Sequence, residues 1–523
     1  MFKKQLAASA AAIAIVLAAA PAHADGQAED ARISALETRI EQLEETNRLL
    51  LQYLEQSGAM PGSGAAPATH HDMPASHHAA PAQNPAPAPA PMADASGHSS
   101  MHDHMMSELG GSFVGLSPDY SYNMLDHAVN TNTRQLLLLQ AMQNGELNNR
   151  VTLSGSITAL ADIQQSNSNS KFGWLMRHPT PSNQIGEDVS EFVIHSAQLA
   201  TTARLAENVT AYMEFLYNPE QSFGAGTITT LERNQIQLRK AYVLFGNLEN
   251  SPIYASIGKM DTPFGLNDTV SPFTNSSNWH AFAGLAYGAT IGYYANGLHL
   301  RAMAIQGGAQ FRGANTSVEG TNVPSRVNNF AVDANYTARL GNDGTLLIGA
   351  SYQHGTAYCQ DYPVTHFNVC ADNNPAWAVY SQLDMGDFTL MGEYATTTQV
   401  WPGSHVTDPL NPLSIYEASE ALAFSLGGAY HMDIGAPSDL DMSLEFSRFR
   451  AGADGAPWER QDQYVAGLGY FIAPSVSLFG ELIHTEGWVP LNFLSGGNLP
   501  GGATWSERDA TTDVLTFGVQ AAF

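Results

Sequence analysis

From Val151 onward the sequence alternates hydrophobic residues with small or polar ones, which is typical of β-strands whose two faces meet different surroundings. Alternating segments begin near Val151, Ser190, Asn208, Ile236, Pro252, Ala286, Leu298, Val327, Thr345, Pro375, Asp387, Ser419, Asp439, Asp462, Ser475 and Thr511. Short connections, as at Asn296-Gly297, alternate with long ones, as at residues 164–189. This rhythm predicts an all-β transmembrane barrel of about 16 antiparallel strands, with short turns at one rim and long loops at the other.

A soluble β-sandwich is the alternative for such an alternation. Its strands are usually about five or six residues long, whereas the segments here run to about ten residues, enough to cross a bilayer when tilted. The last segment places Leu515, Phe517, Val519 and Phe523 on one face. We therefore expect this strand to close the barrel against the first one, and its C-terminal Phe resembles the signal by which outer-membrane barrels are recognised for assembly.

The first 24 residues have the features of a cleavable secretory signal. A basic start and an apolar stretch over residues 6–20 precede a small-x-small cleavage site at residues 22–24. The apolar stretch is too short for a membrane-spanning helix. We expect the mature chain to begin at Asp25 and to reach the bacterial outer membrane, with its N-terminal region in the periplasm.

Three segments with different compositions are expected between the signal and the barrel at residues 151–523. Residues 25–57 carry a heptad pattern that predicts a coiled-coil helix. Its core positions are Ile33, Leu36, Ile40, Leu43, Asn47, Leu50 and Leu54. Residues 58–108 are an Ala/Pro/His/Met-rich, disordered linker, and residues 109–150 are a helical bridge that leads to the barrel. The coiled coil predicts a homo-oligomer, either a dimer or a trimer.

The linker concentrates side chains that bind transition metals. Imidazole suits Cu(II), Ni(II) and Zn(II), and thioether suits Cu(I). The candidate ligands are His70, His71, His77, His78, His98, His102, His104 and Met105. We expect a loosely bound Cu, Zn or Ni ion, because disordered ligands must become ordered on binding; a plain spacer is the alternative. No cofactor is expected to be required.

The net charge of −27 argues against nucleic acid or an anionic lipid surface as the partner. The partners we expect are outer-membrane lipid and a small solute. Cys359 and Cys370 are the two cysteines of the chain, and an oxidising compartment favours a local disulfide between them. The sequence contains no Gly-x-Ser-x-Gly elbow and no Ser-His-Asp set that stands out on one strand pair, so we expect no enzyme activity.

The predicted strand faces assign several charged side chains to the lumen. A basic residue facing lipid at mid-membrane costs roughly 2–4 kcal/mol, and a position at a rim is the alternative for each residue. The inward-facing candidates are His299, Arg301, Glu393, Glu445 and Glu481. The loop at residues 258–286 is expected to fold into the pore and narrow it, with Lys259 and Asp261 at its base.

One stretch resembles a known family. The segment RKAYVLFGNLENSPIYASIGKMDTPFG, residues 239–265, is similar to LbtU-type siderophore porins. The resemblance implies an N-terminal coiled coil, a sixteen-strand outer-membrane barrel and passage of ferric siderophore. GKMDTPFG is more distantly similar to phosphate-selective O/P-type porins, but the basic ladder that phosphate selectivity needs is missing from this acid-rich chain.

The sequence thus predicts a porin for passive diffusion of small solutes, with ferric siderophore or metal-chelate uptake as its specialisation. An acidic channel should favour cations or neutral solutes, unless much of the charge lies on surface loops. The alternative function is a metal-sequestering or envelope-tethering protein that uses the barrel as an anchor.

Overall fold

The computed structural model describes residues 113–167, 187–217, 236–306, 327–341, 343–359, 373–401, 418–435, 439–454, 459–489 and 507–523. The chain divides into two units, Met1–Ala93 and Asp94–Phe523, and the described residues belong to the second. Within it the elements follow in the order β1 (Val114–Leu116), α4 (Pro118–Leu125), α5 (Arg134–Gln143), β2 (Val151–Ser166), β3 (Asp188–Ala206), β4 (Val209–Tyr217), β5 (Ile236–Phe245), β6 (Ile253–Asp261), α6 (Ser277–Phe282), β7 (Leu285–Ala295), β8 (Leu298–Gln306), β9 (Val327–Leu340), β10 (Gly344–Gln353), β11 (Ala376–Met385), β12 (Phe388–Val400), β13 (Ala418–Asp433), β14 (Asp439–Gly452), β15 (Gln461–Ala473), β16 (Val476–Val489) and β17 (Glu507–Ala522).

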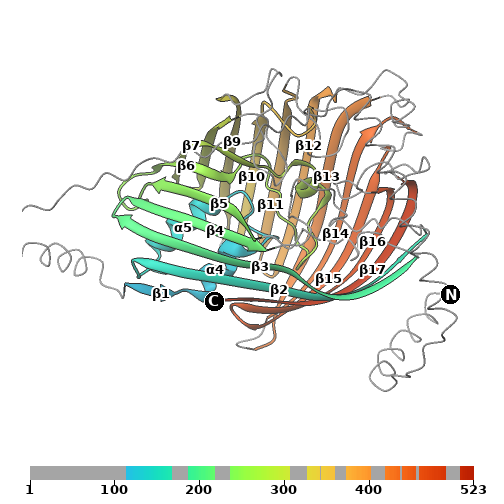
Figure 1. The fold of residues 1–523 in the computed structure, drawn as a ribbon, viewed down its shortest axis with the longest axis horizontal. Coiled ribbons are helices and arrows are strands. Elements are labelled where there is room, and N and C mark those ends of the chain that lie inside the picture. Colours follow the sequence, from blue (N-terminus) through green and yellow to red (C-terminus); the bar gives the residue numbers. More distant parts are fainter. Residues whose placement is uncertain are drawn as a thin grey trace, which may run out of the picture. The chain divides into compact units, whose positions relative to one another are not determined.

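Strands β2–β17 form the predicted antiparallel barrel (Figure 1). Each strand pairs with the next, and β17 closes the sheet against β2 in a register that runs from Thr512 opposite Ser166 to Ala522 opposite Ser156. The short strand β1 adds a parallel pairing to β2. The predicted strand starts agree closely with the observed ones, and the largest difference is β17, which begins at Glu507 rather than near Thr511.

The last residue is held in place as the sequence indicates. Phe523 exchanges two backbone hydrogen bonds of 2.9 Å with Gly155 on β2. A Cβ atom at Gly155 would lie 2.1 Å from the Phe523 ring, so glycine is needed for the ring to lie there. The C-terminal aromatic is therefore part of the junction between β17 and β2 and not a frayed end.

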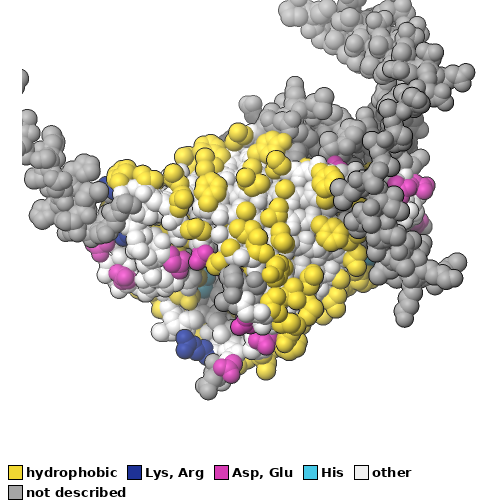
Figure 2. Space-filling model, turned by 90° about the horizontal axis from the view of Figure 1, so that it is seen from below, with side chains coloured by type: hydrophobic (Ala, Val, Ile, Leu, Met, Phe, Trp, Pro, Cys, Tyr) yellow, Lys and Arg dark blue, Asp and Glu magenta, His cyan; other side chains and the backbone are white. Residues whose placement is uncertain are grey.

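The outer wall carries hydrophobic side chains at every second position. Leu444, Leu482 and Phe517 are 69%, 57% and 51% exposed, while their inward neighbours Ser443 and Thr516 are buried. Figure 2 shows hydrophobic side chains spread across one face of this wall. Such a surface is stable against lipid and not against water. No helix among the described residues is long and apolar enough to cross a membrane.

A charge on this outer face should weaken the barrel in lipid. We expect Leu444→Arg to lower the free energy of unfolding by roughly 2–4 kcal/mol, the cost of a basic residue near the bilayer midplane. Denaturant titration in lipid vesicles measures it, with Leu444→Phe as the size-matched apolar control. Equal stability of the two variants would show that Leu444 does not face lipid.

Two segments lie inside the barrel. Helices α4 and α5 fall within the predicted helical bridge, residues 109–150, and lie within the curve of β2–β5 in Figure 1. The interpretation of this region as a bridge is incomplete, because α4 contacts the lumen side of β2 and β17. Tyr120 hydrogen-bonds Thr202 at 2.9 Å, and Ser121 donates to Ser154 at 2.8 Å. We call residues 113–150 the pre-barrel segment.

The second internal segment is residues 262–284, between β6 and β7, which we call the infolded loop. It corresponds to the loop predicted to narrow the pore, and that prediction of its place is confirmed. Its helix α6 starts at the N-cap Ser276, whose side chain accepts a hydrogen bond from the Trp279 backbone. α6 contacts β12, β13 and β14 on the lumen side.

Candidate functional site

Three carboxylates on alternate strands hold the infolded loop against the wall. Glu393 on β12 accepts hydrogen bonds from the backbone N–H groups of residues 266 and 267, at 3.1 and 2.8 Å. Glu445 on β14 accepts from the Thr269 hydroxyl at 2.6 Å and the residue 270 amide at 3.3 Å. Glu481 on β16 accepts from the amides of residues 273 and 274, at 2.8 and 3.0 Å. These three residues face inward as predicted, and each of them anchors the infolded loop.

The strands between these carboxylates leave room for the loop. A Cβ atom at Gly427 on β13 would lie 2.4 Å from Val270, and one at Gly467 on β15 would lie 2.4 Å from Pro272. Carboxylates and glycines thus alternate across β12–β16, matching the loop's amides and side chains in turn. The infolded loop therefore has one defined position on this wall.

The pre-barrel segment rests on a different part of the wall. Its apolar side chains form one buried cluster with inward-facing residues of β3–β9. The wall residues of this cluster are Ala200, Tyr212, Tyr242, Leu244, Tyr254, Met260, Ala286, Met303, Ile305 and Ala331. The lumen face is therefore not polar throughout, because these side chains are buried in one cluster with residues of α4 and α5.

The chain between α4 and α5, residues 126–133, is hydrogen-bonded along its length to the infolded loop; we call this contact the seam. His127 Nε2 donates to the Phe273 carbonyl at 2.8 Å, and the Thr269 amide donates to the Ala128 carbonyl at 3.0 Å. Asn132 Nδ2 donates to the carbonyls of residues 264 and 265, at 2.6 and 2.9 Å. The two internal segments therefore meet across the lumen.

Asp268 is the charged group of the seam. Its carboxylate accepts the backbone N–H groups of Asn130 and Thr131, at 3.0 and 2.8 Å. Burial raises the pKa of Asp268 to about 6, while the hydrogen bonds from Thr131 and Asn130 act in the opposite direction. The two backbone amides favour the ionised carboxylate, and hydrogen bonds to an ionised acceptor are of the stronger, charge-assisted kind.

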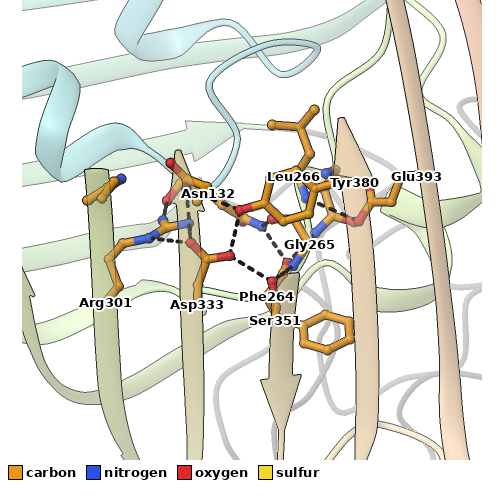
Figure 3. A network of polar contacts seen from close by, with 12 residues as sticks. Asn132, Phe264, Gly265, Leu266, Arg301, Asp333, Ser351, Tyr380 and Glu393 are labelled. Atoms are coloured by element: carbon orange, nitrogen blue, oxygen red, sulfur yellow. Dashed lines mark hydrogen bonds and ion pairs between the residues drawn. The ribbon is translucent and has the colours of Figure 1, made fainter. Parts of the chain in front are cut away.

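An ion pair on the wall completes the contact between the segments (Figure 3). Arg301 on β8 donates to Asp333 on β9 at 2.8 Å and also to the Asn132 carbonyl. The other Asp333 oxygen accepts from Ser351 and Tyr380, at 2.7 and 2.6 Å. Ser351 in turn accepts the residue 265 amide at 2.9 Å. Wall, pre-barrel segment and infolded loop are joined in one polar network.

A cavity of about 210 Å³ lies beside this network. Asn132, Thr133 and Gln140 border it from the pre-barrel segment, and Tyr294 and Thr337 border it from the wall. The cavity lies at the junction of the three parts, and its lining is mixed, with leucines 136, 137, 266 and 347 beside the polar side chains. It can hold a small hydrogen-bonding molecule.

Of the remaining predicted pore residues, His299 also borders this cavity. His299 accepts or donates a 2.7 Å hydrogen bond with Tyr254 on the inner wall. Asp261 pairs with the buried Lys240 at 2.6 Å. The prediction that Lys259 belongs to the pore is corrected. Lys259 shares the outer face of β6 with Ile257, and its Nζ lies 5.8 Å from the Tyr287 ring centroid. It therefore lies on the outside near the long-loop end of β6, and does not line the lumen.

Several predictions fall outside the described residues. These are the signal peptide, the coiled coil, the linker with its His and Met ligands, and Cys370. Cys359 is disulfide-bonded. Within the described ranges, no group of three or more His, Cys, Asp or Glu side chains is arranged to hold a metal ion.

A closed sixteen-strand barrel, hydrophobic outside and narrowed by an infolded loop, defines an outer-membrane channel. The family model described as Gram-negative porin matches residues 141–487, more than half of the chain. The chain belongs to the Gram-negative porin family. It is a non-enzymatic channel of the bacterial outer membrane for the passive diffusion of solutes.

Several solved structures are similar to this chain. An anion-selective porin from Comamonas acidovorans is 12% identical, with 71% of this chain and 99% of that chain covered and a TM-score of 0.42. The outer-membrane channel DcaP of Acinetobacter baumannii is 14% identical, with 71% and 97% covered and a TM-score of 0.43. OprB of Pseudomonas putida is 9% identical, with 73% and 97% covered and a TM-score of 0.44. No curated protein matches the chain.

Proposed function

We propose that this porin carries small metal chelates, ferric siderophores among them, into the periplasm. The resemblance of residues 239–265 to LbtU-type siderophore porins supports this specialisation. A His/Met-rich linker that precedes the barrel in the sequence supports it too, because such a tract offers ligands to a transition metal on the periplasmic side.

Block of single-channel current tests the proposed solute. A ferric hydroxamate siderophore, its iron-free form and inorganic phosphate are added in turn to channels in a planar bilayer. We expect reversible block by the ferric form at concentrations where the other two have no effect. Identical currents with all three compounds would contradict the siderophore proposal and leave a general porin.

The linker is proposed to bind Cu, Zn or Ni loosely through His70, His71, His77, His78, His98, His102, His104 and Met105. Calorimetric titration of the refolded protein with each metal measures the affinity, and a variant with these eight residues changed to Ser is the control. We expect weak binding that the variant loses. Undiminished binding by the variant would place the metal elsewhere.

The alternative function is metal sequestration or envelope tethering with the barrel as an anchor. Metal binding combined with fully blocked conductance would favour it.

We also propose that residues 25–57 assemble a homo-oligomer, because a single helix of this length is marginal in water alone. Analytical ultracentrifugation of the full mature chain in detergent distinguishes a dimer from a trimer, and a monomer would contradict the proposal.

A further inference from the structure

The pre-barrel segment and the infolded loop occupy different parts of the lumen. α4 and α5 lie against β2–β9 and β17, whereas the infolded loop is fixed on β12–β16. The two meet at the seam, where the hydrogen bonds of His127, Ala128, Asn130, Thr131 and Asn132 join them. A solute that crosses the barrel must therefore pass both segments.

The inner wall is adapted to the pre-barrel segment. Leu244, Met260 and Met303 face inward and are 1%, 0% and 1% exposed. A water-filled lumen would carry polar residues at such positions. These side chains belong to the same buried cluster as apolar residues of α4 and α5, so the wall carries apolar residues in the part of the lumen that holds the pre-barrel segment.

From these contacts we propose that the pre-barrel segment sets the size limit of this channel, with the seam as its closing contact. This goes beyond the porin function, in which the infolded loop alone narrows the pore. The cavity of about 210 Å³ beside the seam is bordered by both internal segments and by the wall, so opening the seam would widen this space.

The two segments are anchored in different ways. Glu393, Glu445 and Glu481 on the wall accept five backbone amides of the infolded loop. The pre-barrel segment is bound to the wall by the hydroxyl pairs of Tyr120 with Thr202 and Ser121 with Ser154, by wall arginines that donate to its carbonyls, and by apolar contacts. The infolded loop is continuous with barrel strands at both ends, β6 and β7, whereas the pre-barrel segment continues into the barrel only at β2. When the seam opens, we therefore expect the pre-barrel segment to be the part that moves.

Weakening the seam tests the proposal. Asp268→Ala removes the acceptor of two backbone amides, and Asn132→Ala removes the donor to two carbonyls. We expect each variant to raise single-channel conductance at least about two-fold, because current follows the open cross-section, and to admit larger neutral sugars in liposome swelling. Asn123→Ala, on the exposed side of α4, is the matched control and should conduct as the parent does.

A reversible cross-link identifies the moving part. Ser121 and Ser154 lie with their hydroxyls 2.8 Å apart, so Ser121→Cys with Ser154→Cys should form a disulfide that fixes α4 to β2. In the Asp268→Ala background we expect oxidation to return the conductance to the parent value and reduction to raise it again. Asp268→Ala without the added cysteines controls for reduction of the disulfide at Cys359.

The outcomes separate this inference from the channel function. Conducting parent channels with unchanged Asp268→Ala and Asn132→Ala currents would overturn the size-limit role and leave the porin function intact. A raised current that oxidation does not suppress would overturn it as well, because the infolded loop would then be the moving part. Heat-modifiable migration on gels confirms that each variant has a folded barrel. If Asp268→Ala does not fold, Asn132→Ala replaces it as the variant that weakens the seam.

Discussion

Glu481→Ala should release one end of the infolded loop and produce channels with larger, noisier single-channel currents. The change leaves the buried backbone amides of Phe273 and Thr274 without their acceptor. Each such group costs about 1–3 kcal/mol, so we expect the free energy of unfolding to fall by roughly 2–6 kcal/mol in total. Single-channel recording and the temperature at which heat-modifiable mobility is lost on gels measure the two effects.

Two matched variants make this prediction specific. Glu481→Gln keeps a side-chain acceptor without the charge and should lie between the parent and Glu481→Ala. Glu249→Ala removes an exposed glutamate from the short turn at residues 246–252 and should change neither current nor stability. If Glu481→Ala behaves as Glu249→Ala does, the carboxylate does not anchor the loop.

Arg301→Met should destabilise the barrel strongly, because it leaves the buried Asp333 carboxylate without its counter-ion. Removing one partner of a buried ion pair costs about 3–5 kcal/mol. Both side chains are almost inaccessible, at 3% and 0% exposed, so solvent does not screen the lost attraction. Denaturant unfolding of the reconstituted protein measures the change.

The double variant Arg301→Met with Asp333→Asn provides the control for charge. Neutralising both partners removes the uncompensated carboxylate and keeps an acceptor for Ser351 and Tyr380. We expect it to recover most of the stability lost in Arg301→Met. A double variant as unstable as the single one would mean that Arg301 acts through its packing or its bond to the Asn132 carbonyl.

The barrel could be predicted from the sequence because period-two alternation reports directly on which side chain faces lipid. Leu444, Leu482 and Phe517 face outward, and Glu393, Glu445 and Glu481 face inward, as that alternation requires. The closing strand and its C-terminal Phe523 followed from the same rule. The barrel can therefore be predicted without knowledge of any side-chain contact.

The contents of the lumen could not be predicted in the same way. The partners of Glu481 lie some 200 positions away in the chain, at Phe273 and Thr274, and one sequence carries no signal for that pairing. One available signal was overlooked: Leu244, Met260 and Met303 are apolar at inward positions of β5, β6 and β8, which indicates an internal segment packed on that wall. Lys259 was misplaced because the base of a loop does not define which face of the strand a residue occupies.

Steady single-channel conductance tests the central claim most directly. Residues 25–523 are refolded, inserted in a planar bilayer and recorded one channel at a time under a salt gradient. A passive channel predicts long-lived, ohmic openings in the parent protein. A folded, heat-modifiable barrel that passes no ions at any voltage would contradict it.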